Sequence, residues 1–536
     1  MSHQPLLGQK ILVTAYDLEQ SEHRGIAVYS KALIRCLHEA GAEVWLLTEF
    51  YDLLKERGLR GLPRATRSMI RSARILSDLA HGQRGRQPTL WERKLALARK
   101  AKRWRDRFGV ADKLIRRPRR YRARHLHSFR LDELYDSPYP RAERLGYLRH
   151  VTGIVSAPEL FSATQLASRL RRQKPVEIDF QGFDALLTTC PLNLKPKNLP
   201  VFVQSVHDLI PLEFVAHNED PLMFSHRLQA CLPARRLFVS HSTARKFQAH
   251  ISRLSPGDRR TSLATRHPEE RVIVQPPSLR FPAWLTADPE QVADLKPVCH
   301  LLRPSISPST QAEAALKAID GALNEPQGKT ETISLPLSTG ATRSDTKLLQ
   351  PFRYFLFNSS VEERKNLLFL AKAYAESDLY REGIKLCVTG KLKGDDYSRS
   401  LEDIVSHEPG IMLTGYVDES AKLDLYLNAM GLVSPSLVEG FGIPVLDGAC
   451  LGMPTLASDC ESHREIEALH DFNEHVLSLD TLDSREWAAA MQAIAGRHQH
   501  TWQEAASERR RRIGRYVAWH KTFFAQLEED LCEVLS

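Results

Sequence analysis

Residues 432–468 read LVSPSLVEGFGIPVLDGACLGMPTLASDCESHREIEA, and this stretch contains the pattern that decides the fold. Its apolar start predicts a buried strand that ends near Ser434. A turn with two glycines follows, and Pro444 predicts the first turn of a helix, where its missing N–H would have had no partner. The glycines allow a ligand to approach the backbone, and the first N–H groups of a helix can bind it. The stretch therefore predicts a strand–turn–helix unit that binds an anionic or hydroxyl-rich ligand.

Two acidic residues, Glu439 and Asp447, accompany this turn. One lies on the predicted turn and the other about one turn into the helix, so their carboxylates can accept hydrogen bonds from two sets of sugar hydroxyls. The spacing alone leaves two interpretations open. The corner binds a sugar, or it is an ordinary corner with solvated acids.

The stretch resembles the signature of family 4 retaining glycosyltransferases, in which a Glu, a G-F-G turn and a second Glu eight positions on face the sugar nucleotide. The segment GMPTLASD (452–459) also fits that family. The resemblance implies that Glu439 and the amides of Gly440, Phe441 and Gly442 hold hydroxyls of the donor sugar. It implies that the second acid binds the ribose, and here that acid is Asp447, one methylene shorter than the usual Glu.

The N-terminal half opens with a βαβ unit: the strand KILVTAYD (10–17), a loop, a helix that follows Gly25, and the strand EVWLLTEF (43–50). The segment VFVQSVHDLIP (201–211) predicts another strand, which ends at His207. Doubly wound sheets bind ligands at the carboxyl ends of their strands, where both Gly25 and His207 are expected. A helix-entry glycine and a structural histidine are the alternatives. The resemblance, through H-D-L-I-P, implies that Gly25 lies at the donor and that His207 approaches the donor sugar.

The second half begins with the strand FRYFLFNSS (352–360), followed by EERKN (362–366). Adjacent cations at a helix start suit a diphosphate, because arginine offers a planar fork and lysine a point charge, although a solvated pair would look the same. The segment resembles the family's E-x-R-K-N motif, which implies that Arg364 and Lys365 bind the donor phosphates. The resemblance also places the nucleobase against the loop of Gly415, Tyr416 and Val417.

A basic insertion separates the strands of the first half. Residues 55–150 contain 28 Lys and Arg but only 9 Asp and Glu, whereas the whole chain has a net charge of +9. Within them, LWERKLALARKAKRWRDRF (90–108) has apolar residues at helical spacing among many cations. Basic amphipathic helices bind anionic membranes, so we predict that residues 85–125 contact a membrane surface. A helix packed on the domain and an arginine-rich segment (113–124) that touches nucleic acid are the alternatives. Because no nucleic-acid-binding motif is present, a nucleic-acid partner is not expected.

The length of 536 residues exceeds what one core supports. We expect an N-terminal domain at 1–299 that carries the insertion, and a linker at 300–350, where Ser, Thr and Pro are frequent. A second domain is expected at 351–515, followed by a helix at 516–536 that crosses back to the first domain, as in the family.

No stretch of about 18 apolar residues occurs, and the chain begins without the apolar core of a signal peptide. The eight cysteines contain no C-x-x-C pair, which indicates buried thiols. These features predict a cytoplasmic protein, peripheral on the inner face of the membrane if the basic insertion binds lipid.

The order of these motifs is similar to that of family 4 and implies an α/β fold: two doubly wound, Rossmann-like domains facing each other across a cleft, the GT-B arrangement. It implies a retaining hexosyltransferase with Glu439, His207, Arg364 and Lys365 as the catalytic residues. Arg364 and Lys365 would stabilise the departing nucleoside diphosphate, a role that other folds give to a metal. No D-x-D motif stands at a suitable place, so neither a metal nor another cofactor is expected.

The H-D-L-I-P and E-E-R-K-N strings most resemble mannosyltransferases of bacterial surface polysaccharide synthesis. GDP-mannose is therefore the first donor to test, with a glycan or lipid-linked acceptor as in lipopolysaccharide synthesis. Two alternatives remain open. One is another enzyme of the same fold, such as a phosphorylase or a soluble disaccharide synthase. The other is a non-catalytic scaffold or sensor that binds sugar nucleotides.

Overall fold

The computed structural model describes residues 4–20, 25–50, 59, 61–82, 120–132, 143–169, 174–214, 219–254, 270–281, 348–470, 472–497 and 502–535. Contacts divide the chain into two units. The first unit comprises residues 1–276, 439–441 and 521–536, and the second comprises 277–438 and 442–520. Three predictions fall largely outside the described residues: the helix within 90–108, membrane contact by 85–125 and the linker at 300–350.

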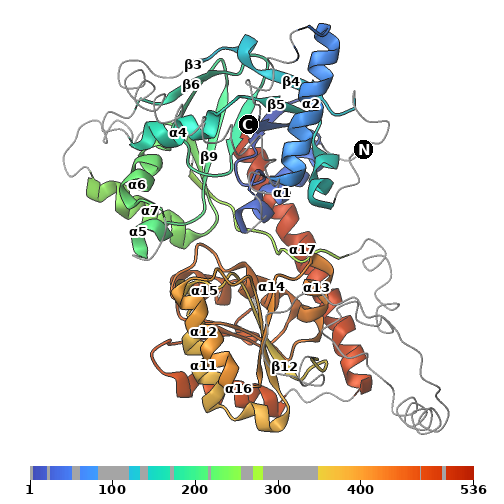
Figure 1. The fold of residues 1–536 in the computed structure, drawn as a ribbon, viewed down its shortest axis with the longest axis vertical. Helices are drawn as coiled ribbons and strands as arrows, with labels where there is room; N and C mark the ends of the chain where they lie inside the picture. The colour runs from blue at the N-terminus through green and yellow to red at the C-terminus, as the bar shows by residue number, and fades with distance from the viewer. Residues whose placement is uncertain are drawn as a thin grey trace, which may run out of the picture. The chain divides into compact units, whose positions relative to one another are not determined.

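The first unit is built on an eight-stranded sheet (Figure 1). Its strands, in spatial order, are β11 (Glu270–Val272), β10 (Arg235–Phe238), β9 (Val201–Val206), β7 (Ala185–Thr188), β1 (Lys10–Thr14), β2 (Glu43–Thr48), β5 (Gly153–Ser156) and β4 (His127–Arg130). All neighbours are parallel except the edge pair β4 and β5. The chain runs outward in both directions from the boundary between β1 and β7, which makes that boundary the topological switch point. A small parallel sheet of β3 (Arg120–Tyr121), β6 (Val176–Asp179) and β8 (Leu194–Lys197) accompanies it.

The described helices of the first unit include α1 (Gly25–Glu39), α2 (Arg64–His81), α4 (Leu160–Arg169), α5 (Ile210–Glu213), α6 (Pro221–Ala230) and α7 (His241–Leu254), with 3₁₀ segments η2 (Ala123–His125) and η3 (Glu143–His150). Helix α6 has a standard start: Pro221 is the first helical residue, and the Asp220 side chain accepts a hydrogen bond of 2.9 Å from the Leu222 amide. The four-residue β7 is buried along its whole length, as expected of a central parallel strand.

The second unit contains a six-stranded parallel sheet in the order β14 (Ile411–Gly415), β13 (Lys385–Thr389), β12 (Tyr354–Asn358), β15 (Gly431–Ser434), β16 (Thr455–Ser458) and β17 (Val476–Leu479). This is the 3-2-1-4-5-6 order of a Rossmann sheet, with its switch point between β12 and β15. Together with the parallel sheet of the first unit, it confirms the predicted fold class of two doubly wound α/β domains.

Helices cover this sheet through short connections: η6 (Glu363–Lys365), α11 (Leu367–Glu376), η7 (Leu379–Glu382), α12 (Asp396–His407), α13 (Glu419–Asn428), α14 (Ile443–Leu451), α15 (Glu461–Glu467), η8 (Phe472–Glu474) and α16 (Ser484–Arg497). Helix α11 packs against α12 and α16, whereas α14 packs against α15 (Figure 1). Strands that progress in opposite directions from a switch point place their helices on opposite faces, because the crossovers are right-handed. The sheet is therefore covered on both sides and buries its apolar strands.

The last helix, α17 (Trp502–Leu535), is longer than the predicted segment 516–536. It belongs to the second unit up to His520 and to the first from Lys521. The sequence upstream of 516 is rich in arginine and looks solvated, but Arg512 is 1% exposed. Its guanidinium donates to the carbonyl of Ala429 at 2.7 Å and pairs with Glu508 at 3.1 Å. Buried carbonyls thus take the place of water around this cation.

The change from the first unit to the second along the chain lies at residues 276 and 277, whereas the predicted boundary at 299 lies outside the described residues. Ser278 and Leu279 are held by hydrogen bonds to residues of the second unit, Asp447 and Tyr516.

Among the described helices, none combines the length and apolar character needed to cross a membrane.

Candidate functional site

The switch point of the second unit carries two of the predicted motifs. β12 is followed by η6, which contains Arg364 and Lys365, and β15 is followed by the loop that leads to Gly442. Gly442 has φ of 102°, and a Cβ there would lie 2.8 Å from the His463 ring, so only glycine fits this N-cap of α14. Pro444 stands in the first turn of α14. The predicted strand–turn–helix unit is therefore confirmed.

Arg364 links the two loops. Its carbonyl accepts a hydrogen bond of 2.8 Å from the Leu437 amide, and its Nη1 donates to the Val438 carbonyl at 3.4 Å. Its Nε donates to Glu362 at 2.9 Å. Lys365 is buried, at 4% exposure, whereas the Arg364 side chain is 17% exposed. Of the two predicted phosphate-binding cations, Arg364 is thus the more accessible.

Glu362 is ionised in this arrangement. Burial raises its pKa, but the charge of Arg364 and the hydrogen bond and charge of Lys393 outweigh burial and lower the pKa to about 2. Lys393 follows β13 and its Nζ lies 2.8 Å from Glu362. Neither Glu362 nor Lys393 was among the predicted site residues.

The predicted nucleobase loop lies at the end of β14, the edge strand next to β13. Gly415 has φ of 72°, which favours glycine, and Tyr416 is 74% exposed. Val417 is partly exposed, and the next residue, Asp418, caps α13 by accepting a hydrogen bond of 2.7 Å from the Ala421 amide. The loop therefore presents backbone and one aromatic ring on a fixed turn, which suits a flat ligand.

Asp447 lies in α14 and is 1% exposed. One oxygen accepts from the Ser278 amide at 2.7 Å and the Tyr516 hydroxyl at 2.8 Å, and the other accepts from the Ser278 hydroxyl at 2.6 Å. Burial raises the pKa of Asp447 despite these hydrogen bonds. A ribose could reach this carboxylate only by displacing contacts within the unit. The predicted ribose role therefore stays a prediction, while a structural role is visible directly.

In the first unit, His207 directly follows β9, as predicted. Its Nε2 lies 2.8 Å from the Thr189 carbonyl, and because a carbonyl only accepts, Nε2 carries the proton. Burial lowers the pKa of His207 to about 4, partly offset by that hydrogen bond, so the ring is neutral at pH 7. The Tyr29 ring packs edge-on against it at 5.1 Å.

The signature residues 439–441 are counted with the first unit, and the Gly440 carbonyl explains why. It accepts hydrogen bonds from the hydroxyls of Ser240 at 3.1 Å and Thr243 at 3.2 Å. A Cβ on Gly440 would lie 2.6 Å from the His207 carbonyl. The structure thus brings His207 and the turn that holds Glu439 together. Glu439 is partly exposed and Phe441 is buried.

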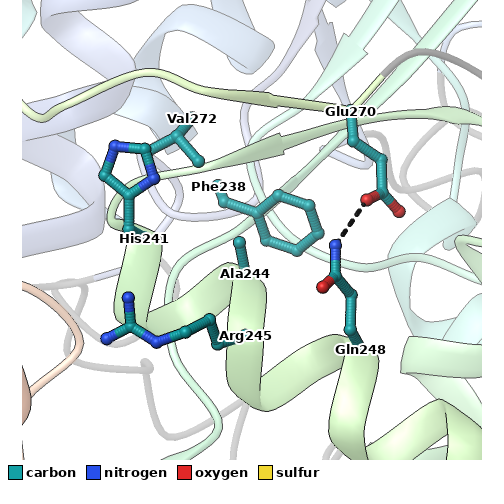
Figure 2. A pocket seen from close by; sticks show the side chains of 7 residues that line it. All are labelled: Phe238, His241, Ala244, Arg245, Gln248, Glu270 and Val272. Atoms are coloured by element: carbon teal, nitrogen blue, oxygen red, sulfur yellow. Dashed lines mark hydrogen bonds between the residues drawn. The ribbon is translucent and has the colours of Figure 1, made fainter.

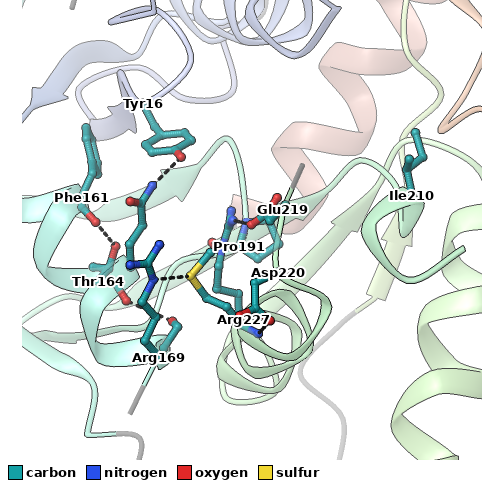
Figure 3. Close-up of polar contacts among 12 residues, drawn as sticks. Tyr16, Phe161, Thr164, Arg169, Pro191, Ile210, Glu219, Asp220 and Arg227 are labelled. Carbon is teal, nitrogen blue, oxygen red and sulfur yellow. Dashed lines mark hydrogen bonds and ion pairs between the residues drawn. The ribbon is translucent and has the colours of Figure 1, made fainter. Parts of the chain in front are cut away.

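A second polar network lies beside His207, at the switch point of the first unit. The Thr189 hydroxyl donates to Asp17 at 2.7 Å, and the Thr189 amide donates to the Thr14 hydroxyl at 2.9 Å. Asp17 is 9% exposed, and burial raises its pKa to about 7 although the hydrogen bond from Thr189 and the charge of Arg227 oppose this. Arg227 donates to the Pro191 carbonyl at 2.9 Å and pairs with Glu219 (Figure 3).

Gly25, the remaining predicted donor residue, is the first residue of α1. The site predicted from sequence omitted Asp17, Thr189, Ser240 and Thr243. Thr189 directly follows β7, Asp17 and Ser240 lie shortly after the ends of β1 and β10, and Thr243 is in the first turn of α7, so strand ends were the usable signal.

A pocket of about 290 Å³ lies elsewhere in the first unit, between β10, β11 and α7 (Figure 2). It is lined by Phe238, His241, Ala244, Arg245, Gln248, Glu270 and Val272. Glu270 accepts hydrogen bonds from Gln248 at 2.9 Å and Arg236 at 2.7 Å, so its charge is engaged within the wall. None of the predicted site residues lines this pocket.

Within the described part of the chain, no group of three or more His, Cys, Asp or Glu residues is arranged to hold a metal ion.

Residues 353–496 match the family model described as glycosyl transferases group 1. These residues form a glycosyl transferases group 1 domain. A segment of 167 residues is 27% identical to the O-antigen chain mannosyltransferase B of Escherichia coli; the match covers 29% of this chain and 44% of that relative, so the chain spans less than half of the relative's length. Among solved structures, sucrose-phosphate synthase from Thermosynechococcus elongatus has a TM-score of 0.46 at 13% identity, covering 97% of this chain and 98% of that one. Anabaena HepE in complex with UDP has a TM-score of 0.46 at 11% identity, and the match covers 98% of this chain and 99% of that one.

The glycosyl transferases group 1 domain contains Arg364, Lys365, the Gly415 turn and the 432–468 stretch. It does not include His207 or Asp17, so these polar residues of the first unit lie outside the segment that matches the family model.

Proposed function

We propose that this protein is a retaining glycosyltransferase that moves a hexose from a nucleotide sugar to a hydroxyl of a glycan or lipid-linked acceptor. The observation that carries the proposal is the switch point of the group 1 domain. There Arg364 joins the loop after β12 to the loop after β15 through the Leu437 amide and the Val438 carbonyl. A cation held at the carboxyl edge of a Rossmann sheet, where such sheets bind ligands, suits a nucleoside diphosphate.

In the proposed reaction, the bond between the anomeric carbon and the phosphate oxygen breaks, and a bond from the acceptor oxygen forms on the same face. The leaving diphosphate takes the proton of the acceptor hydroxyl, so no protein carboxylate has to act as a nucleophile. Arg364 and Lys365 stabilise the charge that grows on the diphosphate, as preorganised cations do in a partly buried site. Glu439 and the amides of Gly440 and Gly442 bind sugar hydroxyls.

His207 enters this proposal as a neutral group. With its proton on Nε2 and bonded to Thr189, its Nδ1 is an acceptor for a sugar or acceptor hydroxyl. In this proposal His207 therefore orients a hydroxyl group and does not supply positive charge.

Mannose is the proposed hexose, with GDP-mannose as donor. The partial likeness to an O-antigen chain mannosyltransferase supports it, as do the H-D-L-I-P and E-E-R-K-N strings. Reaction without a metal, synthesis of a lipopolysaccharide-type polymer and a place at the inner face of the membrane are parts of the same proposal. Deleting residues 85–125 is expected to reduce binding to anionic vesicles, and unchanged binding would refute the membrane part alone.

The decisive experiment combines a thermal-shift screen against UDP-, GDP- and ADP-sugars with a transfer assay on the donor that stabilises the protein. Glu439→Ala is expected to abolish transfer while the melting temperature without ligand stays within about 2 °C of wild type. Glu461→Ala, an exposed acid at the start of α15, is the matched control. Normal transfer by Glu439→Ala would overturn the site assignment.

A non-catalytic protein that binds sugar nucleotides is the second candidate. Asp447 favours it, because the acid expected at the ribose is hydrogen-bonded to Ser278 and Tyr516 of its own unit. Donor binding without transfer to any glycan or lipid-linked acceptor in a broad panel would favour this candidate over the enzyme.

A further inference from the structure

The loops after β12 and β13 lie against each other at the carboxyl edge of the second unit. The two strands are parallel neighbours, paired from Tyr354–Lys385 to Asn358–Thr389. Immediately after β13, Gly390 has φ of 139°, and a Cβ there would lie 2.1 Å from the Ser359 carbonyl oxygen. Because only glycine allows this approach, the β13 loop is held against the loop that leads to Arg364.

Glu362 occupies the point where these loops meet. Its Oε2 accepts from Arg364 Nε at 2.9 Å, and its Oε1 accepts from Lys393 Nζ at 2.8 Å. Lys365, which is buried nearby, adds a third positive charge that acts on the same carboxylate. Three cations thus act on this one carboxylate.

Lys393 is the most accessible of these cations. Its side chain is 35% exposed, compared with 17% for Arg364, and Lys365 is 4% exposed. An ammonium group has three N–H donors, so one hydrogen bond to Glu362 does not exhaust it. A flexible lysine can therefore rotate towards an added anion while Glu362 continues to hold Arg364.

We propose that Lys393 is a further donor-binding residue, which contacts the diphosphate of the nucleotide, and that Glu362 holds Lys393 and Arg364 in place when no diphosphate is bound. This inference rests on the proposed function, because it assumes a nucleoside diphosphate at the β12–β15 switch point. It identifies the ligand group by chemistry: each of the two phosphates of a nucleotide sugar is negatively charged, and the departing diphosphate gains further charge that a third cation can stabilise. A phosphate group close to a lysine forms charge-assisted hydrogen bonds, which are stronger than neutral ones.

The test measures binding of UDP, GDP and ADP, each beside its monophosphate, by isothermal titration calorimetry at two salt concentrations. Lys393→Met is expected to weaken binding of the preferred diphosphate about tenfold, and its monophosphate by a smaller factor. Lys393→Arg keeps the charge and is expected to recover most of the affinity. Lys372→Met, on α11, is the matched control, since its side chain is 67% exposed and pairs only loosely with Glu376 at 3.8 Å.

Glu362→Gln gives an opposite expectation. It removes the competing negative charge, so diphosphate affinity should rise and depend more steeply on salt. If Lys393 and Glu362 form only a structural pair, both variants lower the melting temperature and leave the ratio of diphosphate to monophosphate affinity unchanged, which overturns the inference.

Failure of the proposed function looks different. Wild-type protein that binds none of the nucleotides overturns both proposals. A different result would overturn only the role of Lys393: the wild-type protein binds a diphosphate, Arg364→Ala abolishes this binding, and Lys393→Met leaves it unchanged.

Discussion

Both large sheets have acidic or histidine side chains, buried or partly buried, shortly after their parallel strands, but the environment shifts the pKa values of these groups in different ways. In the first unit, burial lowers the pKa of His207 to about 4 and raises that of Asp17 to about 7, so both groups are pushed towards their neutral forms. In the second unit, Glu362 is also penalised by burial, yet the cations Arg364 and Lys393 lower its pKa to about 2.

The difference lies in the partners of each carboxylate. Asp17 accepts a hydrogen bond from the Thr189 hydroxyl, and the charge of Arg227, which itself pairs with Glu219, also acts on it. Glu362 receives two direct ion pairs. Desolvation dominates where hydrogen bonds are neutral, and Coulombic attraction dominates where cations touch the acid. The same strand-end position can thus provide a neutral hydrogen-bonding edge or a cationic, anion-binding edge.

The largest expected effect is at the cationic edge. Arg364→Ala should lower transfer about 10²–10³-fold, because one preorganised group that stabilises developing charge is lost. Steady-state kinetics and diphosphate affinity measure this. Arg381→Ala is the control, since the Arg381 side chain is 81% exposed beside Asp378. If Arg364→Ala binds the diphosphate as tightly as the wild type, the edge that carries Arg364 is not an anion-binding edge.

The desolvated edge is tested by pH. The folded-state pKa of His207 is about 4 against an ordinary 6.5, so the unfolded state binds the extra proton and stability falls as pH drops from 6.5 to 4. Asp17, at about 7 against 3.8, binds its proton in the folded state, so its contribution falls as pH rises from 3.8 to 7. Each contribution is on the order of 3 kcal/mol, and in the wild type they oppose each other.

Single substitutions should separate these two contributions. Relative to wild type, Asp17→Asn should lose stability on acidification through this window, and His207→Gln should gain it. Urea unfolding at a series of pH values gives both difference curves. Two flat curves would show that neither group is desolvated as described.

Asp447 sharpens the comparison, because it is a buried acid in the second unit with neutral partners, like Asp17. Asp447→Asn should destabilise the protein by about 2 kcal/mol, since an amide oxygen cannot accept all of the hydrogen bonds from Ser278 and Tyr516. Asp396→Asn, whose side chain is 97% exposed, should change stability by less than about 0.5 kcal/mol. If Asp447→Asn retains wild-type stability but binds the donor more weakly, the ribose role predicted from sequence gains support over the structural one.

The smallest expected effect compares two tyrosine hydroxyls. That of Tyr29, beside His207, is buried with no hydrogen-bond partner among the described residues, so Tyr29→Phe should be neutral or stabilise slightly. That of Tyr426 accepts a hydrogen bond of 3.0 Å from Asn358, so Tyr426→Phe should cost about 1 kcal/mol. Denaturant midpoints measure both. Equal losses would mean that the Tyr29 hydroxyl is hydrogen-bonded after all.

Local chemistry made much of the site predictable. Pro444 and Gly442 define the start of α14, and His207 lies at the end of an apolar strand, because turn residues and strand ends obey local rules. The partners of these residues were not predictable. Ser240 and Thr243 lie about 200 positions before Gly440 in the chain, and no local pattern records that hydrogen bond.

By itself, the sequence indicated the strand–turn–helix units around the main motifs, the two doubly wound domains and the cations beside the signature turn. Apolar periodicity, glycine and proline act over a few residues, so they can be read without coordinates. Only the tertiary structure decided which acids are charged. Asp17, Asp447 and Glu362 are all acids in the sequence, but their pKa values diverge because burial and distant partners, brought close by folding, set the free energy of each charge.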